Sequence, residues 1–193
     1  MTDYLYLTMD DISKMVHDLW DRIKKSGFKP DCLIGISRGG LIPVRILSDI
    51  SNINDVYIVG VKYYQDIEDK KKKPIITQDV NEKNVKGKIV LFVDDVSDTG
   101  ESIRFIVDHL KKKGIKQLKT LTLHYKPWSV FKPDYYLVTT KKWIIYPWEE
   151  METIKKITER KISEDEKRKE LSRTGIPEDI IKWHLDRIIH KYH

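Results

Sequence analysis

The residues with the clearest potential for chemistry lie between Ile89 and Ser102. The first part, Ile89 to Val93, is a continuous apolar run rich in β-branched residues, which is typical of a parallel strand covered on both faces. Two carboxylates, Asp94 and Asp95, follow it directly. In open α/β sheets ligands bind outside the carboxyl ends of the strands. These carboxylates therefore mark a candidate binding site.

The turn from Ser97 to Ser102 is suited to holding a phosphate. Four apolar residues recur after it at helical spacing: Ile103, Ile106, Val107 and Leu110. Backbone N–H groups at the start of such a helix bind a phosphate without a basic side chain, and Gly100 allows a close approach. Asp94 and Asp95 suit sugar hydroxyls or Mg²⁺ instead. A sugar phosphate satisfies both parts.

The whole segment resembles the 5-phosphoribosyl-1-pyrophosphate (PRPP) binding motif of type I phosphoribosyltransferases, which is a hydrophobic strand, two acidic residues and a D-T-G-x-[ST] loop. The resemblance implies that eight residues bind the ribose 5-phosphate part of PRPP: Asp94, Asp95, Ser97, Asp98, Thr99, Gly100, Glu101 and Ser102. It also implies Mg²⁺ as cofactor, with Asp95 as a metal contact beside PRPP oxygens and waters. The alternative interpretation is an ordinary buried strand with an acidic edge, as in receiver-like domains.

A second strand, Asp31 to Ser37, ends in the turn Ser37-Arg38-Gly39-Gly40. The glycines expose backbone amides and Arg38 adds a cation, which together suit a pyrophosphate. Such a turn by itself is most often only a tight connection. In the resembling family the corresponding loop holds the pyrophosphate of PRPP, commonly through a strained or cis peptide. The resemblance assigns pyrophosphate binding to five residues: Ser37, Arg38, Gly39, Lys62 and Tyr63.

Residues 62–86 are expected to form a hood loop. The end of a strand predicted over Val56–Tyr64 forms the base of this loop. The residues from Gln65 to Lys86 are mostly polar, with a four-lysine run at Lys70–Lys73. In the resembling family this loop is mobile, closes over PRPP and excludes water. The lysine run alone is better explained as a solvated loop than as a substrate contact.

Two further motifs resemble the purine-recognising part of 6-oxopurine phosphoribosyltransferases. Lys126 follows a strand predicted over Gln117–Tyr125, and Trp143-Ile144 precedes Pro147-Trp148. By this resemblance Lys126 contacts the exocyclic group of the base, Trp143 stacks on the ring and the Ile144 backbone reads the base edge. Stacking of a base on an aromatic ring contributes about 1–3 kcal/mol. Taken alone, core packing for Trp143 and a surface position for Lys126 are the simpler interpretations.

The resemblance implies a reaction of nucleotide salvage, in which 5-phosphoribose moves from PRPP to N9 of a purine and pyrophosphate leaves. Asp98 stands where 6-oxopurine enzymes place the general base that accepts the purine proton. Arg38, Mg²⁺ and the loop amides would neutralise the departing pyrophosphate. Asp98 and Arg38 are therefore the candidate catalytic residues.

The identity of the purine depends on two conflicting signals. The core resembles hypoxanthine, guanine or xanthine phosphoribosyltransferases, whereas the C-terminal extension resembles crenarchaeal adenine phosphoribosyltransferases. We expect adenine, giving AMP and pyrophosphate, with hypoxanthine, guanine or xanthine as the alternative. Lys126 favours that alternative, because a lysine donor suits a 6-oxo group better than a 6-amino group.

Two other functions remain open. A regulator that senses PRPP and binds DNA or RNA would need an added helix-turn-helix or a continuous basic face. The first helix is predicted from about Thr8 and the tail helices are mixed in charge, so we expect no nucleic-acid partner. Lys126 and Trp143 argue against the second alternative, an enzyme that acts on a pyrimidine or orotate.

The composition of the 193-residue chain, 40% hydrophobic and 34% charged, is typical of a soluble globular protein. The net charge of +6 suits polyanionic PRPP and pyrophosphate. Cys32 is the only cysteine, which excludes an internal disulfide and favours a reducing cytosol. Because no apolar run approaches the roughly 18 residues of a membrane span and no signal-peptide pattern is present, we expect a cytoplasmic protein with no membrane partner.

The expected architecture is α/β, a type I phosphoribosyltransferase fold with a mainly parallel twisted sheet flanked by helices. Residues 1–149 are expected to form this core, and residues 150–193 a C-terminal helical bundle packed on it. Three helices are predicted in the bundle: Met151–Lys161, Ser163–Arg173 and Pro177–Tyr192. Ser163 and Glu166 make a capping box. A homodimer is expected from the resemblance.

Overall fold

The computed structural model describes residues 2–65 and 72–190 and divides into two compact units. Residues 12–140 form the first, which we call the core unit. The second, which we call the tail unit, combines the N-terminal residues through Asp11 with the residues from Lys141 onward. Each unit has its own hydrophobic core.

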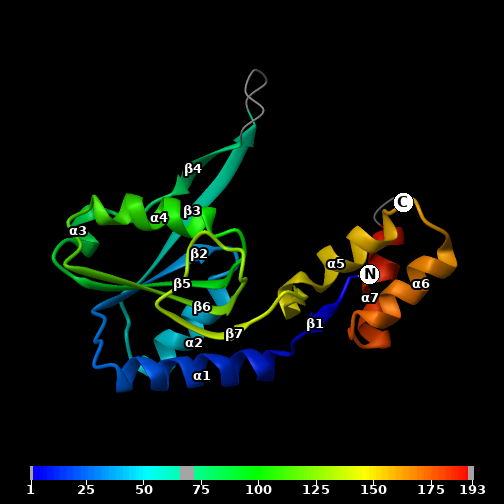
Figure 1. Cartoon of the computed structure of the whole chain (residues 1–193), viewed down its shortest axis with the longest axis horizontal. Helices are drawn as coiled ribbons and strands as arrows, with labels where there is room; N and C mark the ends of the chain where they lie inside the picture. Colours follow the sequence, from blue (N-terminus) through cyan, green and yellow to red (C-terminus); the bar gives the residue numbers. More distant parts are fainter. Residues whose placement is uncertain (1, 66–71, 191–193) are drawn as a thin grey trace. The chain divides into compact units, whose positions relative to one another are not determined.

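The core unit is built on a six-stranded sheet with the strand order β4-β3-β2-β5-β6-β7 (Figure 1). The strands are β2 (Cys32–Ser37), β3 (Val56–Gln65), β4 (Lys72–Gln78), β5 (Ile89–Ser97), β6 (Gln117–Tyr125) and β7 (Tyr135–Thr139). All neighbouring pairs are parallel except β3 and β4. The apolar runs that predicted buried strands in the sequence therefore occupy the centre of a mainly parallel sheet, as expected.

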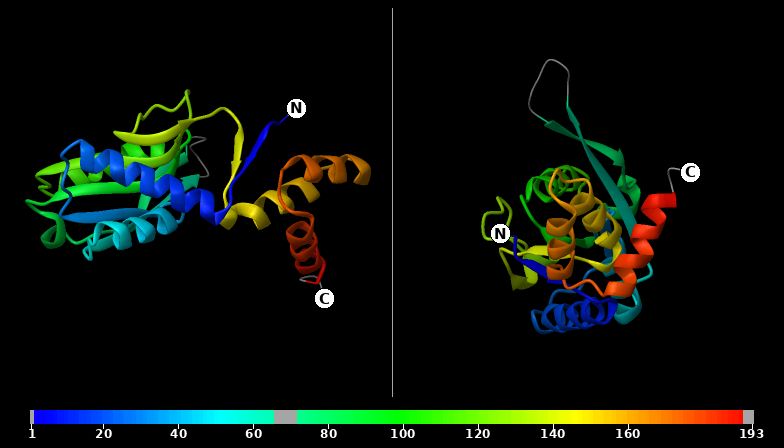
Figure 2. Two further views of the ribbon diagram at one scale, coloured as in Figure 1. Left: turned by 90° about the horizontal axis from the view of Figure 1, so that it is seen from below. Right: turned by 90° about the vertical axis from the view of Figure 1, so that its right-hand side faces the viewer.

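Helices cover both faces of this sheet. They are α1 (Met9–Lys25), α2 (Leu41–Ser51), the short α3 (Glu82–Val85) and α4 (Glu101–Lys111). In Figures 1 and 2, α1 and α2 lie on one face and α4 lies on the other. None of the helices in the described ranges combines the length and the hydropathy that a membrane span requires.

Alternation along the strands sends side chains to the two helical layers in turn. Ile34 and Phe92 are buried in one cluster with Ile106 of α4. Gly35, the next residue along β2, faces the opposite layer, because a Cβ atom there would lie 2.8 Å from a methyl group of Val44 in α2. The sheet is therefore covered on both faces, which confirms the α/β class with flanking helices.

The segment expected to be a hood loop contains regular structure. β3 continues to Gln65, and β4 pairs with it antiparallel, with Lys62 opposite Ile75. Residues 66–71 lie outside the described residues, so the lysine run Lys70–Lys73 is described only from its third residue. Closure of this segment over a substrate stays a prediction.

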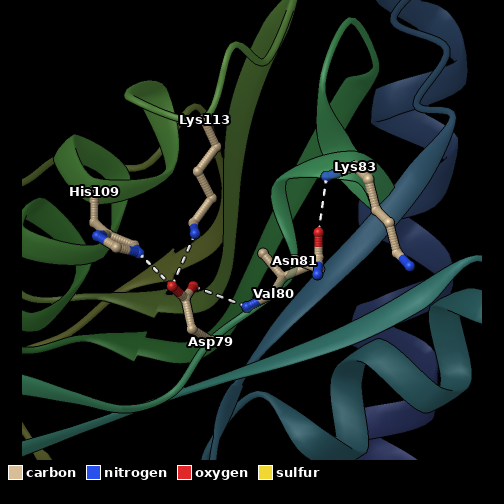
Figure 3. Close-up of polar contacts among 6 residues, drawn as sticks. All are labelled: Asp79, Val80, Asn81, Lys83, His109 and Lys113. Carbon is tan, nitrogen blue, oxygen red and sulfur yellow. Dashed lines mark hydrogen bonds and ion pairs between the residues drawn. The ribbon is translucent and has the colours of Figure 1, made fainter.

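Contacts to α4 and to the residues after it attach residues 79–86, which include the short helix α3, to the core unit (Figure 3). The Asp79 carboxylate accepts a hydrogen bond from Lys113 Nζ at 2.8 Å and lies 2.9 Å from His109 Nε2. Val80 and Val85 are buried in the cluster that also contains the apolar face of α4. Polar composition suggested a solvated loop, but two buried valines and one ion-pair cluster attach this segment to the core.

The tail unit contains a small parallel sheet and a group of helices. Its elements are β1 (Tyr4–Tyr6), β8 (Trp143–Ile145), the 3₁₀ turn η1 (Pro147–Glu149), α5 (Glu150–Thr158), α6 (Glu164–Arg173) and α7 (Glu178–His190). The three predicted C-terminal helices are present, and Ser163 and Glu166 form the predicted capping box at the start of α6. Their shared core includes Ile145, Ile154 and Leu171.

The division between the two units differs from the boundary expected at residue 149. β8 precedes that residue, yet it pairs with β1 near the N-terminus. The Trp143 amide donates to the Asp3 carbonyl at 2.8 Å, and the Leu7 amide donates to the Ile145 carbonyl at 3.1 Å. Backbone pairing across most of the chain length therefore places both segments in the tail unit. Packing of the helices on the core stays a prediction.

The buried histidine of β6 gives a testable consequence for stability. His124 is 1% exposed, and burial, assisted by the nearby charge of Lys126, lowers its pKa from 6.5 to about 4. Between these values the unfolded chain binds a proton that the folded protein does not, so the free energy of unfolding falls as the pH falls through this window. At about 1.4 kcal/mol per pKa unit, the loss approaches about 3 kcal/mol at pH 4.

We therefore expect the H124Q variant to lose less stability than the wild type between pH 7 and about pH 4.5. Urea unfolding of both proteins at both pH values measures the loss of stability in each. The other titrating groups contribute equally to the two losses, so the difference between them reports on His124. An equal loss of stability in the two proteins would show that His124 is not held in its neutral form.

Candidate active site

The predicted site residues of the core unit gather at one edge of the sheet because β2, β5 and β6 are adjacent and parallel. Their carboxyl ends lead into three loops at residues 37–40, 97–102 and 126–131, and Asp94 and Asp95 lie in the last part of β5. β3 runs parallel to β2 and extends past its end, since Ser37 pairs with Gly60. Lys62 and Tyr63 therefore follow on the same side of the sheet.

The loop after β2 lies directly against the acidic end of β5. A Cβ atom on Gly39 would lie 2.6 Å from the carboxylate of Asp95, and one on Gly40 would lie 2.3 Å from the Val93 carbonyl oxygen. Asp95 is only 6% exposed, so the carboxylate has little space into which it can retreat. Glycine is thus required at both positions for this close approach.

Arg38 in this loop and Asp94 in β5 complete the charged groups at this edge of the sheet. The Ser37–Arg38 peptide bond is cis, and Arg38 is exposed to solvent. Asp94 is buried, and its Oδ1 accepts a hydrogen bond from the Asp95 amide at 2.8 Å. The arrangement brings one exposed cation and two carboxylates to adjacent strand ends.

The loop after β5 is shaped by Gly100, which has a φ of +81° and precedes the first residue of α4. A side chain at Gly100 would meet Ser129 Oγ at 2.3 Å and the Phe131 amide nitrogen at 2.6 Å. The Thr99 carbonyl accepts a hydrogen bond from the Val130 amide at 2.8 Å. The loop at the start of α4 is therefore packed tightly against residues 126–131.

Ser97 and Ser102 have different surroundings within this loop. Ser97 is fully buried, and its hydroxyl donates to the Phe131 carbonyl at 2.7 Å, so it holds the two loops together. Ser102 lies on the first turn of α4, with its Oγ 3.0 Å from the Tyr63 hydroxyl of β3. Of these two serines, only Ser102 is partly exposed, so its hydroxyl is the one that a ligand can reach.

Lys126 is buried rather than on the surface. It is 6% exposed, and burial lowers its pKa, with the charge of Asp98 opposing that effect. The Lys126 amide donates to the Ser97 carbonyl at 3.1 Å. The lysine is therefore fixed beside the loop that carries Asp98.

Trp128 was not identified from the sequence, although it lies at the same place. Its indole N–H donates to Asp98 Oδ1 at 3.2 Å, and Lys126 Nζ lies 5.5 Å from the centre of its ring. Its position two residues after Lys126 is the one feature of the sequence that points to Trp128 as a site residue.

The other predicted purine contacts belong to the tail unit. Trp143 is 46% exposed, with Lys156 Nζ 5.1 Å from its ring, and Ile144 is buried and pairs with Leu5 of β1. The structure thus assigns Lys126 to one unit and Trp143 with Ile144 to the other. Stacking of a base on Trp143 stays a prediction.

The donor set at the end of β5 fits a hard cation held partly by substrate. Within residues 2–65 and 72–190, no group of three or more His, Cys, Asp and Glu side chains is placed to hold a metal ion. Mg²⁺ commonly uses only one or two carboxylates, together with waters and substrate phosphates. The buried carboxylates of Asp94 and Asp95 match that pattern.

Comparison with known proteins identifies the family. The family model described as "Phosphoribosyl transferase domain" matches residues 8–153. Xanthine phosphoribosyltransferase 1 of Saccharomyces cerevisiae is 27% identical, over 75% of this chain and 89% of that protein. A xanthine-guanine phosphoribosyltransferase of Idiomarina loihiensis is 30% identical, over 61% of this chain and 70% of that protein.

A solved structure agrees with these sequence relatives. The purine phosphoribosyltransferase from Pyrococcus horikoshii is 40% identical, covers 77% of this chain and 96% of its own, and superimposes with a TM-score of 0.72. The matched region contains all three loops at the carboxyl edge of the sheet. The chain therefore belongs to the phosphoribosyl transferase domain family, and within it to the type I purine phosphoribosyltransferases.

Proposed function

We propose that this enzyme acts on a 6-oxopurine, transferring 5-phosphoribose from PRPP to N9 of xanthine, guanine or hypoxanthine. The observation that carries the proposal is the buried position of Lys126 next to the loop of Asp98. The names of the two sequence relatives, a xanthine and a xanthine-guanine enzyme, support the same substrate class. The 6-oxopurine alternative is therefore favoured over the adenine that the sequence led us to expect.

The chemistry of Lys126 explains this preference. An ammonium group only donates hydrogen bonds, so it pairs with the 6-oxo oxygen of xanthine, guanine or hypoxanthine. The 6-amino group of adenine is itself a donor and offers the lysine no acceptor. Because Lys126 is 6% exposed, bulk water competes little for its ammonium group, which strengthens a hydrogen bond to an acceptor on the base. The C-terminal helices resemble those of crenarchaeal adenine enzymes, but this resemblance does not explain what would accept a hydrogen bond from Lys126 in place of the 6-oxo oxygen.

In the proposed reaction, the loops after β2 and β5 and the carboxylates at the end of β5 each have a role. The bond from C1 of the ribose to pyrophosphate breaks, the bond from C1 to purine N9 forms, and Asp98 accepts the proton of the purine. Loop 97–102 binds the 5-phosphate at the start of α4, and the carboxylates of Asp94 and Asp95 bind the ribose hydroxyls. Arg38 and the amides of its loop stabilise the charge on the leaving pyrophosphate.

Bound Mg²⁺ would supply further charge neutralisation, held by Asp95 together with oxygens of PRPP. The pyrophosphate site would also include Lys62 and Tyr63 of β3, which extend past the end of β2. We further expect a homodimer in the cytoplasm, for which the support is the family resemblance.

Product analysis with four purine bases tests the proposed substrate class. Purified protein with Mg²⁺ and PRPP receives adenine, hypoxanthine, guanine or xanthine separately, and chromatography resolves the nucleotides. We expect XMP, GMP or IMP, and little AMP. AMP as the main product would contradict the role of Lys126. PRPP binding without any nucleotide product would favour a regulator over an enzyme of purine salvage.

The K126M variant tests the lysine directly. Methionine keeps much of the side-chain length and removes the donor, so we expect kcat/KM for the preferred 6-oxopurine to fall about 10- to 100-fold, the range for a hydrogen bond to a charged group. Steady-state kinetics measure the change, and K132M, which alters an exposed lysine nearby, serves as the control. Equal activity of K126M and K132M would show that Lys126 does not recognise the base.

The G39A variant tests the contact between the loop after β2 and the acidic end of β5. The added Cβ atom would press on the Asp95 carboxylate, so we expect the KM for PRPP to rise about tenfold, a loss of about 1.4 kcal/mol. The KM for the base should change much less. Thermal unfolding of the variant separates this effect from a general loss of structure. An unchanged KM for PRPP in a folded variant would argue against a ribose or metal role for Asp95.

A further inference from the structure

Trp128 is an exposed aromatic residue whose polar edge is directed at a carboxylate. It is 52% exposed, and its indole N–H donates to Asp98 Oδ1 at 3.2 Å. Lys126 Nζ lies 5.5 Å from the centre of its ring, within the range of a cation–π interaction. Trp128 thus contacts both the lysine and the aspartate to which the proposed function gives roles.

The backbone on both sides of Trp128 is fixed to the loop that carries Asp98. On one side the Lys126 amide donates to the Ser97 carbonyl at 3.1 Å, and on the other the Val130 amide donates to the Thr99 carbonyl at 2.8 Å. The Ser129 amide closes a turn by donating to the Lys126 carbonyl at 3.0 Å. The backbone that carries the indole is therefore held in a fixed position relative to the loop of Asp98.

Side-chain contacts strengthen the same attachment. Arg104 of α4 donates from its guanidinium to the Val130 carbonyl at 2.7 Å. Ser97 Oγ and Ser129 Oγ lie 2.8 Å apart. Residues 126–131 and the loop 97–102 consequently behave as one piece, so a group on one loop can fix the geometry of a group on the other.

We propose that Trp128 is a positioning residue for Asp98. The indole N–H holds Oδ1 and so directs Oδ2 toward the position where the purine proton is transferred. A general base must lie within about 2.6–3.2 Å of the proton donor, and an exposed aspartate with no fixed partner would sample several orientations. The inference rests on the proposed function, because it takes Asp98 as the base that accepts the purine proton.

The contact itself can be tested without enzyme activity. In ¹H–¹⁵N spectra the W128F variant identifies the indole resonance of Trp128. We expect this resonance to move in the D98A variant, which removes the acceptor, while the indole resonance of the similarly exposed Trp183 stays in place. A Trp128 resonance that does not move in D98A would overturn the proposal.

Kinetics of a double-mutant cycle test the positioning role. Phenylalanine keeps an aromatic ring and removes the donor, so W128F should lower kcat about 3- to 10-fold, the range for one hydrogen bond, with the KM for PRPP unchanged. In the D98A background the same substitution should cause no further loss, because its effect acts through Asp98. W183F is the matched control and should match the wild type.

The possible results separate this inference from the proposed function. Equal kcat for W128F and the wild type, or equal losses from W128F with and without Asp98, would overturn the positioning role. A wild-type protein that makes no nucleotide from any purine would overturn the proposed function instead. In that case the spectra of D98A would still decide whether Trp128 holds the Asp98 carboxylate.

Discussion

Two backbone hydrogen bonds, from the Lys126 amide to the Ser97 carbonyl and from the Val130 amide to the Thr99 carbonyl, join the segment after β6 to the loop after β5. The candidate site depends on this junction, because it joins the loop proposed to bind phosphate to the lysine proposed to recognise the base. Gly100 makes the junction possible, since any side chain there would collide with Ser129 and Phe131. In the proposed function, the main chain therefore links the recognition of the phosphate to that of the base.

The order of the strands supplies the rest of the site. β2, β5 and β6 are neighbours with parallel directions, so their carboxyl ends present three loops at one edge of the sheet. Contact between Gly39 and Asp95 brings the first two loops together as closely as the backbone permits. Burial also strengthens hydrogen bonds to the few polar groups at this edge, because water competes little for a buried group such as Lys126.

Local signals in the sequence predicted the parts of the structure that depend on local physics. Apolar runs gave β2 and β5, and glycine-rich turns gave the loops that follow them. Long-range pairing was missed. β4 looks like a polar loop because most of its residues are polar, and its pairing with β3 is invisible in its own composition. The pairing of β1 with β8, and the contact of Trp128 with Asp98, likewise join residues that only the fold brings together.

The most direct test of the account is a crystal structure of the protein with a 6-oxopurine nucleoside monophosphate. The account predicts that the phosphate contacts loop 97–102 at the start of α4 and that the ribose hydroxyls lie within hydrogen-bond distance of Asp94 or Asp95. It also predicts that the 6-oxo oxygen accepts a hydrogen bond from Lys126 Nζ. A phosphate bound away from this loop, or a purine whose 6-oxo group faces away from Lys126, would contradict the account.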